Sequence, residues 1–162
     1  MKTETISDKK NFTFRARREF NAGVSLVWRA FTEPNLLDLW WAPKPWKCET
    51  KSMDLKPSGK WEYAMVGPEG ERHSAIQVFE EIVIEDFISG IDAFTDDQGN
   101  INESMPVARW KTTFIPSESG TLVLMEAKYP NAESLETVLN MGMGEGLSLA
   151  QDNLDEVLKS LV

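Results

Sequence analysis

Between residues 47 and 129 the sequence repeats one pattern, in which apolar and polar residues alternate in short runs separated by turn residues. In one such run Trp61, Tyr63 and Met65 occupy every second position. Alternation of this kind places one set of side chains on each face of a β-strand. The pattern therefore predicts six consecutive strands, over residues 47–55, 60–66, 73–83, 87–94, 107–115 and 121–129.

The flanking segments add one strand and three helices. Residues 12–20 alternate and predict a seventh strand, while apolar residues spaced four apart predict short helices over 24–31 and 34–41. An apolar stripe over residues 132–161 predicts a long C-terminal helix. This order fits an α+β fold, in which a strongly bent antiparallel sheet of seven strands carries the long helix across it and two short helices close one end.

The predicted long helix contains the sequence GMGEG at residues 142–146. A glycine inside a helix costs about 1 kcal/mol relative to alanine, so three glycines need a structural reason. Gly142 and Gly146 share a helix face and allow a close approach to a neighbouring element. The alternatives are the roof of a cavity or a kink at this point.

Chain length and composition fit a single folded domain. The 162 residues are 41% hydrophobic, and we expect a mobile N-terminal tail over residues 1–10 followed by one domain over 11–162. No run of 18 apolar residues predicts a membrane span, and no signal peptide precedes the domain. A lone cysteine, Cys48, cannot form an internal disulfide, and these features together indicate a cytoplasmic protein.

Charge argues against nucleic acid as a partner. The net charge is −9, and residues 74–108 contain no basic residue. An acidic chain repels phosphate backbones. We interpret the acidic residues of this stretch as a solvated face, with a binding surface for a basic partner as the alternative. They are Glu80, Glu81, Glu85, Asp86, Asp92, Asp96, Asp97 and Glu103.

Tryptophan is concentrated in PNLLDLWWAPKPW, residues 34–46. Adjacent residues of a helix point about 100° apart, so Trp40 and Trp41 face different directions. We expect Trp40 to seal the short helices onto the sheet and Trp41 to lie at the end of a cavity. Pro43 and Pro45 then hold the exit loop.

Three segments together resemble the START-like (SRPBCC) superfamily, and within it the branch named after the activator of the heat-shock protein 90 ATPase: FNAGVSLVWRAFTEPNLLDLWWAPKPW, MDLKPSGKWEYAMVGPEGE and MGMGEGLSLAQDNLDEVL. The resemblance runs from about residue 12 to residue 161. It implies a helix-grip fold, with a curved seven-stranded antiparallel sheet around the long helix and a hydrophobic cavity between them. One departure is Leu147, where relatives often have tryptophan after the last helix glycine.

Relatives of this kind bind apolar molecules in the cavity. We therefore expect this chain to bind a small hydrophobic or aromatic ligand between the sheet and the C-terminal helix, with aromatic side chains and a few polar groups as the lining. No cofactor, metal site or catalytic residue is predicted. The predicted lining residues are Trp28, Trp41, Trp61, Tyr63, His73, Phe79, Trp110, Phe114, Gly142, Glu145 and Leu149.

Other functions remain open on sequence grounds. The resemblance and the uneven charge also suggest a chaperone-linked stress-response module, although the eukaryotic namesake has a second, chaperone-binding domain that a chain of 162 residues does not hold. A cyclase or hydrolase would draw on His73, Glu145 or Cys48. A homodimer is compatible with the many predicted strands.

Overall fold

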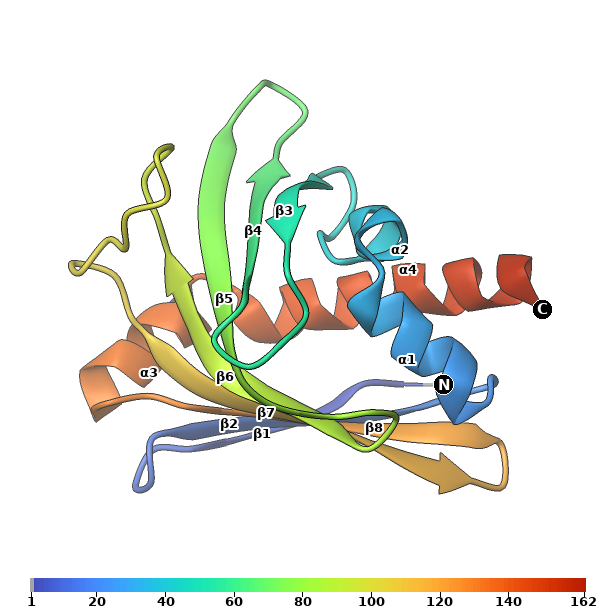
Figure 1. Cartoon of the computed structure of the whole chain (residues 1–162). Helices are drawn as coiled ribbons and strands as arrows, with labels where there is room; N and C mark the ends of the chain where they lie inside the picture. Colours follow the sequence, from blue (N-terminus) through green and yellow to red (C-terminus); the bar gives the residue numbers. More distant parts are fainter. Residues whose placement is uncertain (1) are drawn as a thin grey trace.

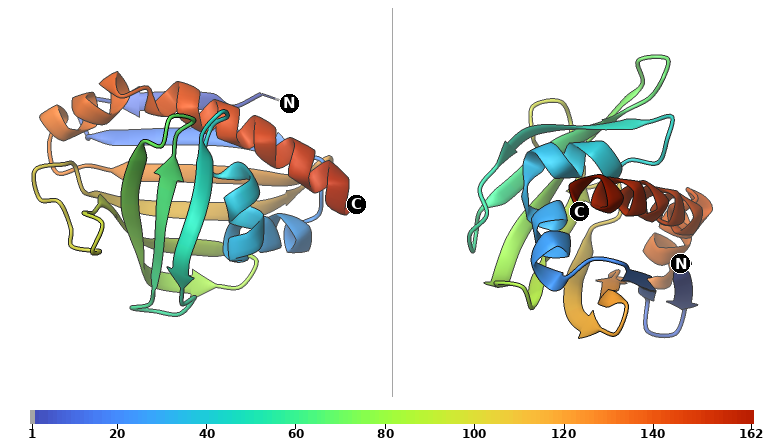
Figure 2. Two further views of the ribbon diagram at one scale, coloured as in Figure 1. Left: turned by 90° about the horizontal axis from the view of Figure 1, so that it is seen from above. Right: turned by 90° about the vertical axis from the view of Figure 1, so that its right-hand side faces the viewer.

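The computed structural model describes residues 2–162 as an α+β fold, in which one curved antiparallel sheet wraps around a long helix (Figures 1 and 2). Its elements in chain order are β1 (Glu4–Asp8), β2 (Thr13–Phe20), α1 (Val24–Thr32), α2 (Pro34–Trp40), β3 (Lys47–Met53), β4 (Lys60–Val66), β5 (Arg72–Val83), β6 (Phe87–Phe94), β7 (Ala108–Ser117), β8 (Gly120–Lys128), α3 (Ala132–Asn140) and α4 (Met143–Leu161). The strands lie in the order β1-β2-β8-β7-β6-β5-β4-β3. The predicted α+β class with one antiparallel sheet is thus confirmed.

The sheet has eight strands rather than the predicted seven. The additional strand, β1, lies where a mobile tail over residues 1–10 was expected, and that expectation is wrong for residues 4–8; Met1 lies outside the described residues. β1 pairs with β2 from Glu4 opposite Arg17 to Asp8 opposite Thr13. Its side chains stay mostly exposed, so backbone pairing to the edge of β2 forms this strand, and no alternation marks it in the sequence.

The C-terminal helical region consists of two helices instead of one continuous helix. α3 ends at Asn140, and Gly142 adopts a left-handed backbone with φ 83° before α4 begins. This conformation favours glycine and breaks the α-helical hydrogen-bond ladder, which confirms the kink that the sequence left open. None of the helices in residues 2–162 is long and apolar enough to cross a membrane.

The two short helices close one end of the sheet beside α4 (Figure 2). Trp40 is fully buried, and its indole N–H donates to the Ala30 carbonyl over 2.9 Å, so it joins α2 to α1 as expected from the sequence. The Asp38 carboxylate accepts from the backbone N–H and the hydroxyl of Thr50 in β3. These contacts fix both helices against the edge of the sheet.

The register of the central strands defines the face that α4 covers. Trp61 of β4 lies opposite Gln77 of β5, Gln77 lies opposite Asp92 of β6, and Asp92 lies opposite Ala108 of β7. Side chains that are directly opposite on neighbouring strands share one face of the sheet. Trp61 packs in one cluster with Leu154 of α4, so this row faces the helix.

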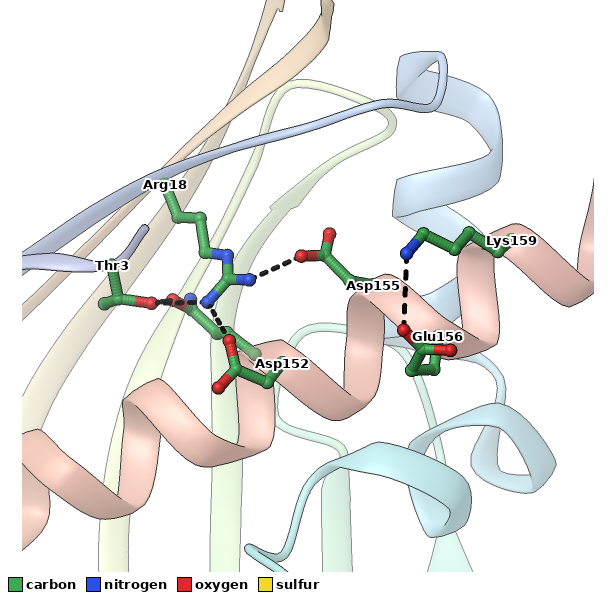
Figure 3. A network of polar contacts seen from close by, with 7 residues as sticks. Thr3, Arg18, Asp152, Asp155, Glu156 and Lys159 are labelled. Carbon is green, nitrogen blue, oxygen red and sulfur yellow. Dashed lines mark hydrogen bonds and ion pairs between the residues drawn. The ribbon is translucent and has the colours of Figure 1, made fainter. Parts of the chain in front are cut away.

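A buried arginine ties α4 to the other half of the sheet (Figure 3). The Arg18 side chain of β2 is 2% exposed and donates to Asp152 over 2.8 Å, to Asp155, and to the Thr3 hydroxyl over 3.0 Å. The Thr3 hydroxyl in turn donates to Gln151 over 2.7 Å. A charge buried to this degree depends on its partners, because water cannot solvate it.

We expect the double substitution Asp152→Asn and Asp155→Asn to lower the free energy of unfolding by about 3 kcal/mol, because it leaves a buried guanidinium uncompensated. Urea unfolding measures the change. A matched control is Glu156→Gln, which removes an exposed pair with Lys159 on the same helix and should cost no more than about 0.5 kcal/mol. Equal losses in the two variants would contradict a dependence of α4 on Arg18.

Gly142→Ala should lower the free energy of unfolding by about 1–2 kcal/mol, because alanine is strained in the left-handed conformation. Space is available there, since an added Cβ would meet only a Glu145 oxygen at 3.6 Å. Gly144→Ala, two positions on inside α4 and with nothing within 4 Å of an added Cβ, should instead stabilise the protein by up to about 1 kcal/mol. Thermal unfolding of both variants tests the assignment, and stabilisation by both would rule it out.

Candidate functional site

An acidic residue lies on the covered face of the sheet. Along β6, Ile88, Gly90, Asp92 and Phe94 occupy every second position, so Asp92 points to the same side as its apolar neighbours. Across the sheet it lies between Gln77 and Ala108. Position in the strand, rather than any charged neighbour, therefore directs this carboxylate toward α4.

The Asp92 carboxylate has no bonding partner among residues 2–162, since none of their side-chain hydrogen bonds or ion pairs includes it. Burial alone raises the pKa of Asp92 from its ordinary value of 3.8 to about 6. Burial, followed by the charge of Asp92, also raises the pKa of the Tyr63 and Tyr129 hydroxyls. The phenols of Tyr63 in β4 and of Tyr129, directly after β8, therefore lie near one carboxyl group that has no partner.

These polar groups lie where the hydrophobic core divides. A larger cluster contains Trp61 and Tyr63, while a smaller one contains Ala108 and Tyr129. Gln77 and Asp92 are the polar members of the row that links Trp61 of the larger cluster to Ala108 of the smaller one. We call the group formed at this boundary the interior seam: Tyr63, Gln77, Asp92, Trp110 and Tyr129.

One tryptophan of the seam and one beside it bear on its hydrogen bonding. The buried indole nitrogen of Trp110 has no partner within the described part of the chain, whereas the indole of Trp41 lies within hydrogen-bonding range of the Tyr63 hydroxyl. The ring of Trp41 packs edge-on against Trp61 and Tyr63. Trp110 of β7 and Phe79 of β5 both lie opposite Gly90 of β6, one on each side, and their rings contact each other over this glycine. Buried donors of this kind cost about 1–3 kcal/mol each when unpaired, so the seam is not optimised for stability.

Most of the predicted aromatic lining residues lie inside the fold. Trp28, Trp61, Tyr63, Phe79 and Phe114 are buried, and Trp41 and Trp110 are partly buried. They pack against one another, with Tyr63 stacked on Trp61 at 4.0 Å and Trp28 edge-on to Phe114 at 5.2 Å. Of these seven residues, the structure brings Trp41, Trp61, Tyr63 and Trp110 to or beside the seam, whereas Trp28 and Phe114 pack together at α1.

The other four predicted residues lie away from the seam. His73 is exposed near the end of β5 and stacks on Trp46 at 5.3 Å. Gly142 caps the start of α4, and Glu145 and Leu149 are exposed on that helix. The structure therefore does not bring these four residues together with the aromatic group.

The residues considered for catalysis do not converge. Cys48 lies opposite Met65 and Met65 lies opposite His73, so two strand spacings separate the thiol from the imidazole. Burial, followed by the charge of Asp38, raises the pKa of Cys48 far above its ordinary value, which keeps the thiol protonated. Within residues 2–162 no cluster of histidine, cysteine and acidic side chains could hold a metal ion.

Two hollows are present at the surface of the molecule. One, of about 200 Å³, lies over β3, β4 and β5 and is lined by Glu49, Glu62, Arg72 and Asp96 among others. The second, of about 90 Å³, lies beside Asp155 and Leu158 near the end of α4. Of the seam residues, Tyr63 alone lines one of these two hollows.

Sequence reasoning missed Asp92 and Gln77. Asp92 was counted with the solvated acidic residues of 74–108, and Gln77 was not singled out. A usable signal was present, because the alternation of β6 assigns Asp92 to the apolar face together with Ile88 and Phe94. The identities of Tyr129 and Trp110 as its neighbours, in contrast, depend on the order of strands in the sheet.

Comparison with solved structures places the fold among bacterial proteins of similar size. Protein Ms6760 from Mycobacterium smegmatis is 30% identical, with 96% of this chain and 95% of that chain covered and a TM-score of 0.89. A protein from Arthrobacter aurescens is 27% identical, with 97% and 91% covered and a TM-score of 0.91. An AHSA1 protein from Silicibacter pomeroyi, 17% identical with 93% and 99% covered and a TM-score of 0.74, shares the fold.

The comparison with curated proteins finds no match. A family model described as "Activator of Hsp90 ATPase homolog 1-like protein" matches residues 21–159, which include α1, α2, α3, most of α4 and all strands after β2. This match confirms the resemblance that the tryptophan and glycine motifs indicated. The chain belongs to the family of activator of Hsp90 ATPase homolog 1-like proteins.

Proposed function

We propose that this protein binds a small apolar or aromatic molecule at the interior seam, between the sheet and α4. The observation that carries the proposal is the Asp92 carboxylate, which has no partner on the helix-facing side of the sheet, with the unpaired indole donor of Trp110 diagonally across from it on β7. Buried polar groups without partners are rare in stable cores and are common where a ligand supplies the partner. The surrounding aromatic side chains provide the apolar contact area for such a ligand.

The position of α4 supports the same proposal. Its backbone approaches α2 more closely than it approaches any strand, so side chains rather than close backbone packing fill the space over the sheet. Gly144 has nothing within 4 Å of an added Cβ, and Gly142 breaks the helix just before it. The start of α4 meets the seam through Met143, whose sulfur accepts a hydrogen bond from the Tyr129 hydroxyl over 3.4 Å.

A chaperone-linked role is a different proposal, which the family name brings to mind. The residues described for this chain add no observation in its favour. Catalysis by Cys48 with His73 is disfavoured by their separation and by the protonated state of the thiol. Ligand binding therefore stands as the single function proposed for the seam.

Native mass spectrometry of the protein purified from its own host tests the proposal. We expect a bound small molecule, and we expect Ala108→Leu to lose it because the larger side chain fills the seam next to Asp92. Ala93→Leu is the matched control, because Ala93 and Ala108 are each 3% exposed. Ala93 follows Asp92 in β6, so its side chain points to the opposite face of the sheet. Absence of any bound molecule, together with no binding from a set of aromatic compounds, would overturn the proposal.

Asp92 should also leave a signature in the pH dependence of stability. Its pKa is raised in the folded state, so its carboxyl favours folding below the unfolded value of about 3.9 and opposes it as pH rises through 6. At about 1.4 kcal/mol per pKa unit, this group lowers the free energy of unfolding by roughly 3 kcal/mol between pH 4 and pH 7.

Urea unfolding of Asp92→Asn between pH 4 and pH 7 measures this contribution, because the amide does not titrate. We expect the variant to be more stable than the native protein at pH 7 and to lose most of the pH dependence. Hydrogen bonds from Asn11 and Asn100 lower the pKa values of Asp8 and Asp96. The contributions of these two residues to the free energy of unfolding therefore change below pH 4 and do not mask the contribution of Asp92. An unchanged pH profile would show that Asp92 is solvated.

A further inference from the structure

We propose that the ligand carries a protonated amine on an aromatic or apolar body, and that the amine pairs with the Asp92 carboxylate while the body packs against Tyr63 and Trp110. This inference rests on the proposed function, because it assigns chemistry to the ligand of the same site. It follows from the charge of Asp92, from its lack of a partner and from the aromatic rings near it.

The charge inventory leaves Asp92, which is half-buried, without a basic partner. Arg18 is the only basic residue that is buried within residues 2–162, and Asp152 and Asp155 neutralise it. The ionisable groups placed near Asp92 are Tyr63 and Tyr129, and both are neutral phenols. A ligand that brings a positive charge restores balance, whereas a carboxylate or phosphate would add a second negative charge at the same place.

Aromatic rings around the carboxylate favour a cation over a neutral polar group. Trp110 of β7 pairs with Gly90 of β6, two residues before Asp92, and therefore lies diagonally across from the carboxylate. Tyr63 of β4 is close enough for the charge of Asp92 to raise its pKa. The faces of tryptophan and tyrosine attract ammonium groups, and the attraction grows when water is excluded. Carboxylate and aromatic faces together therefore select an amine with an apolar body.

The neighbouring residues also argue against the two simplest alternatives. A pure hydrocarbon would fill the seam but leave Asp92 unpaired in a still drier environment, which is unfavourable. A neutral alcohol can donate one hydrogen bond to Asp92, but a charge-assisted bond from an ammonium group is roughly twice as strong. The expected order of affinity is therefore amine, alcohol, hydrocarbon and acid.

Four probes with one ring system test this order: 2-naphthylmethylamine, 2-naphthalenemethanol, 2-methylnaphthalene and 2-naphthoic acid. Binding to the full chain at pH 7.5 is measured by isothermal titration calorimetry and by quenching of tryptophan fluorescence. We expect the amine to bind about tenfold to a hundredfold more tightly than the hydrocarbon, as is typical for a hydrogen bond to a charged group. The acid should bind most weakly.

The variant Asp92→Asn separates a specific pair from general charge attraction. It should remove the advantage of the amine over the hydrocarbon, because amine binding weakens while hydrocarbon binding no longer has to desolvate a charge. Asp97→Asn changes the net charge equally at an exposed loop position and should leave all four affinities unchanged. Circular dichroism of both variants confirms that they are folded.

The outcomes distinguish a preference for amines from ligand binding at the seam in general. Binding of the hydrocarbon with no preference for the amine, or an amine preference that survives Asp92→Asn, would overturn the inference and leave ligand binding intact. Tightest binding of the acid would do the same. Failure of all four probes to bind either the native protein or Asp92→Asn would overturn the proposed function, and the inference with it.

Discussion

One helix has to cover the hollow side of an eight-stranded sheet, and the rest of the structure depends on how this is achieved. α4 is too narrow to fill that space alone, since a helix with its side chains is about 10–12 Å across. α1 and α2 therefore occupy one end, and α3 continues the cover at the other end after the break at Gly142. Arg18 holds α4 to the β2 side of the sheet through Asp152 and Asp155.

Because different helices cover the two ends of the sheet, the hydrophobic core has two parts. The larger cluster forms where the short helices and the second half of α4 meet the sheet, and the smaller cluster forms under α3 and the start of α4. Between them the sheet presents Gln77 and Asp92, which two apolar clusters cannot satisfy. The same arrangement of helices places aromatic side chains on both sides of this boundary between the two clusters.

Alternation and turn residues were sufficient to predict the α+β class, the six strands between residues 47 and 129 and the burial of Trp40. β1 could not be predicted, because its five residues are held by hydrogen bonds to an edge and carry no apolar pattern. Of the candidate site, the aromatic members were predicted from side-chain size. Asp92 was missed because a charged residue was assumed to face water, although its position in β6 indicated the opposite.

The contact between Arg18 and α4 also bears on the order in which the protein is made. Arg18 leaves the ribosome early, and its carboxylate partners lie 134 and 137 positions later in the chain. All eight strands are therefore synthesised before the helix that covers them, and their apolar side has no cover during that time. The contact between Arg18 and its two partners therefore forms only when nearly the whole chain has been made, and contacts so far apart in sequence form slowly.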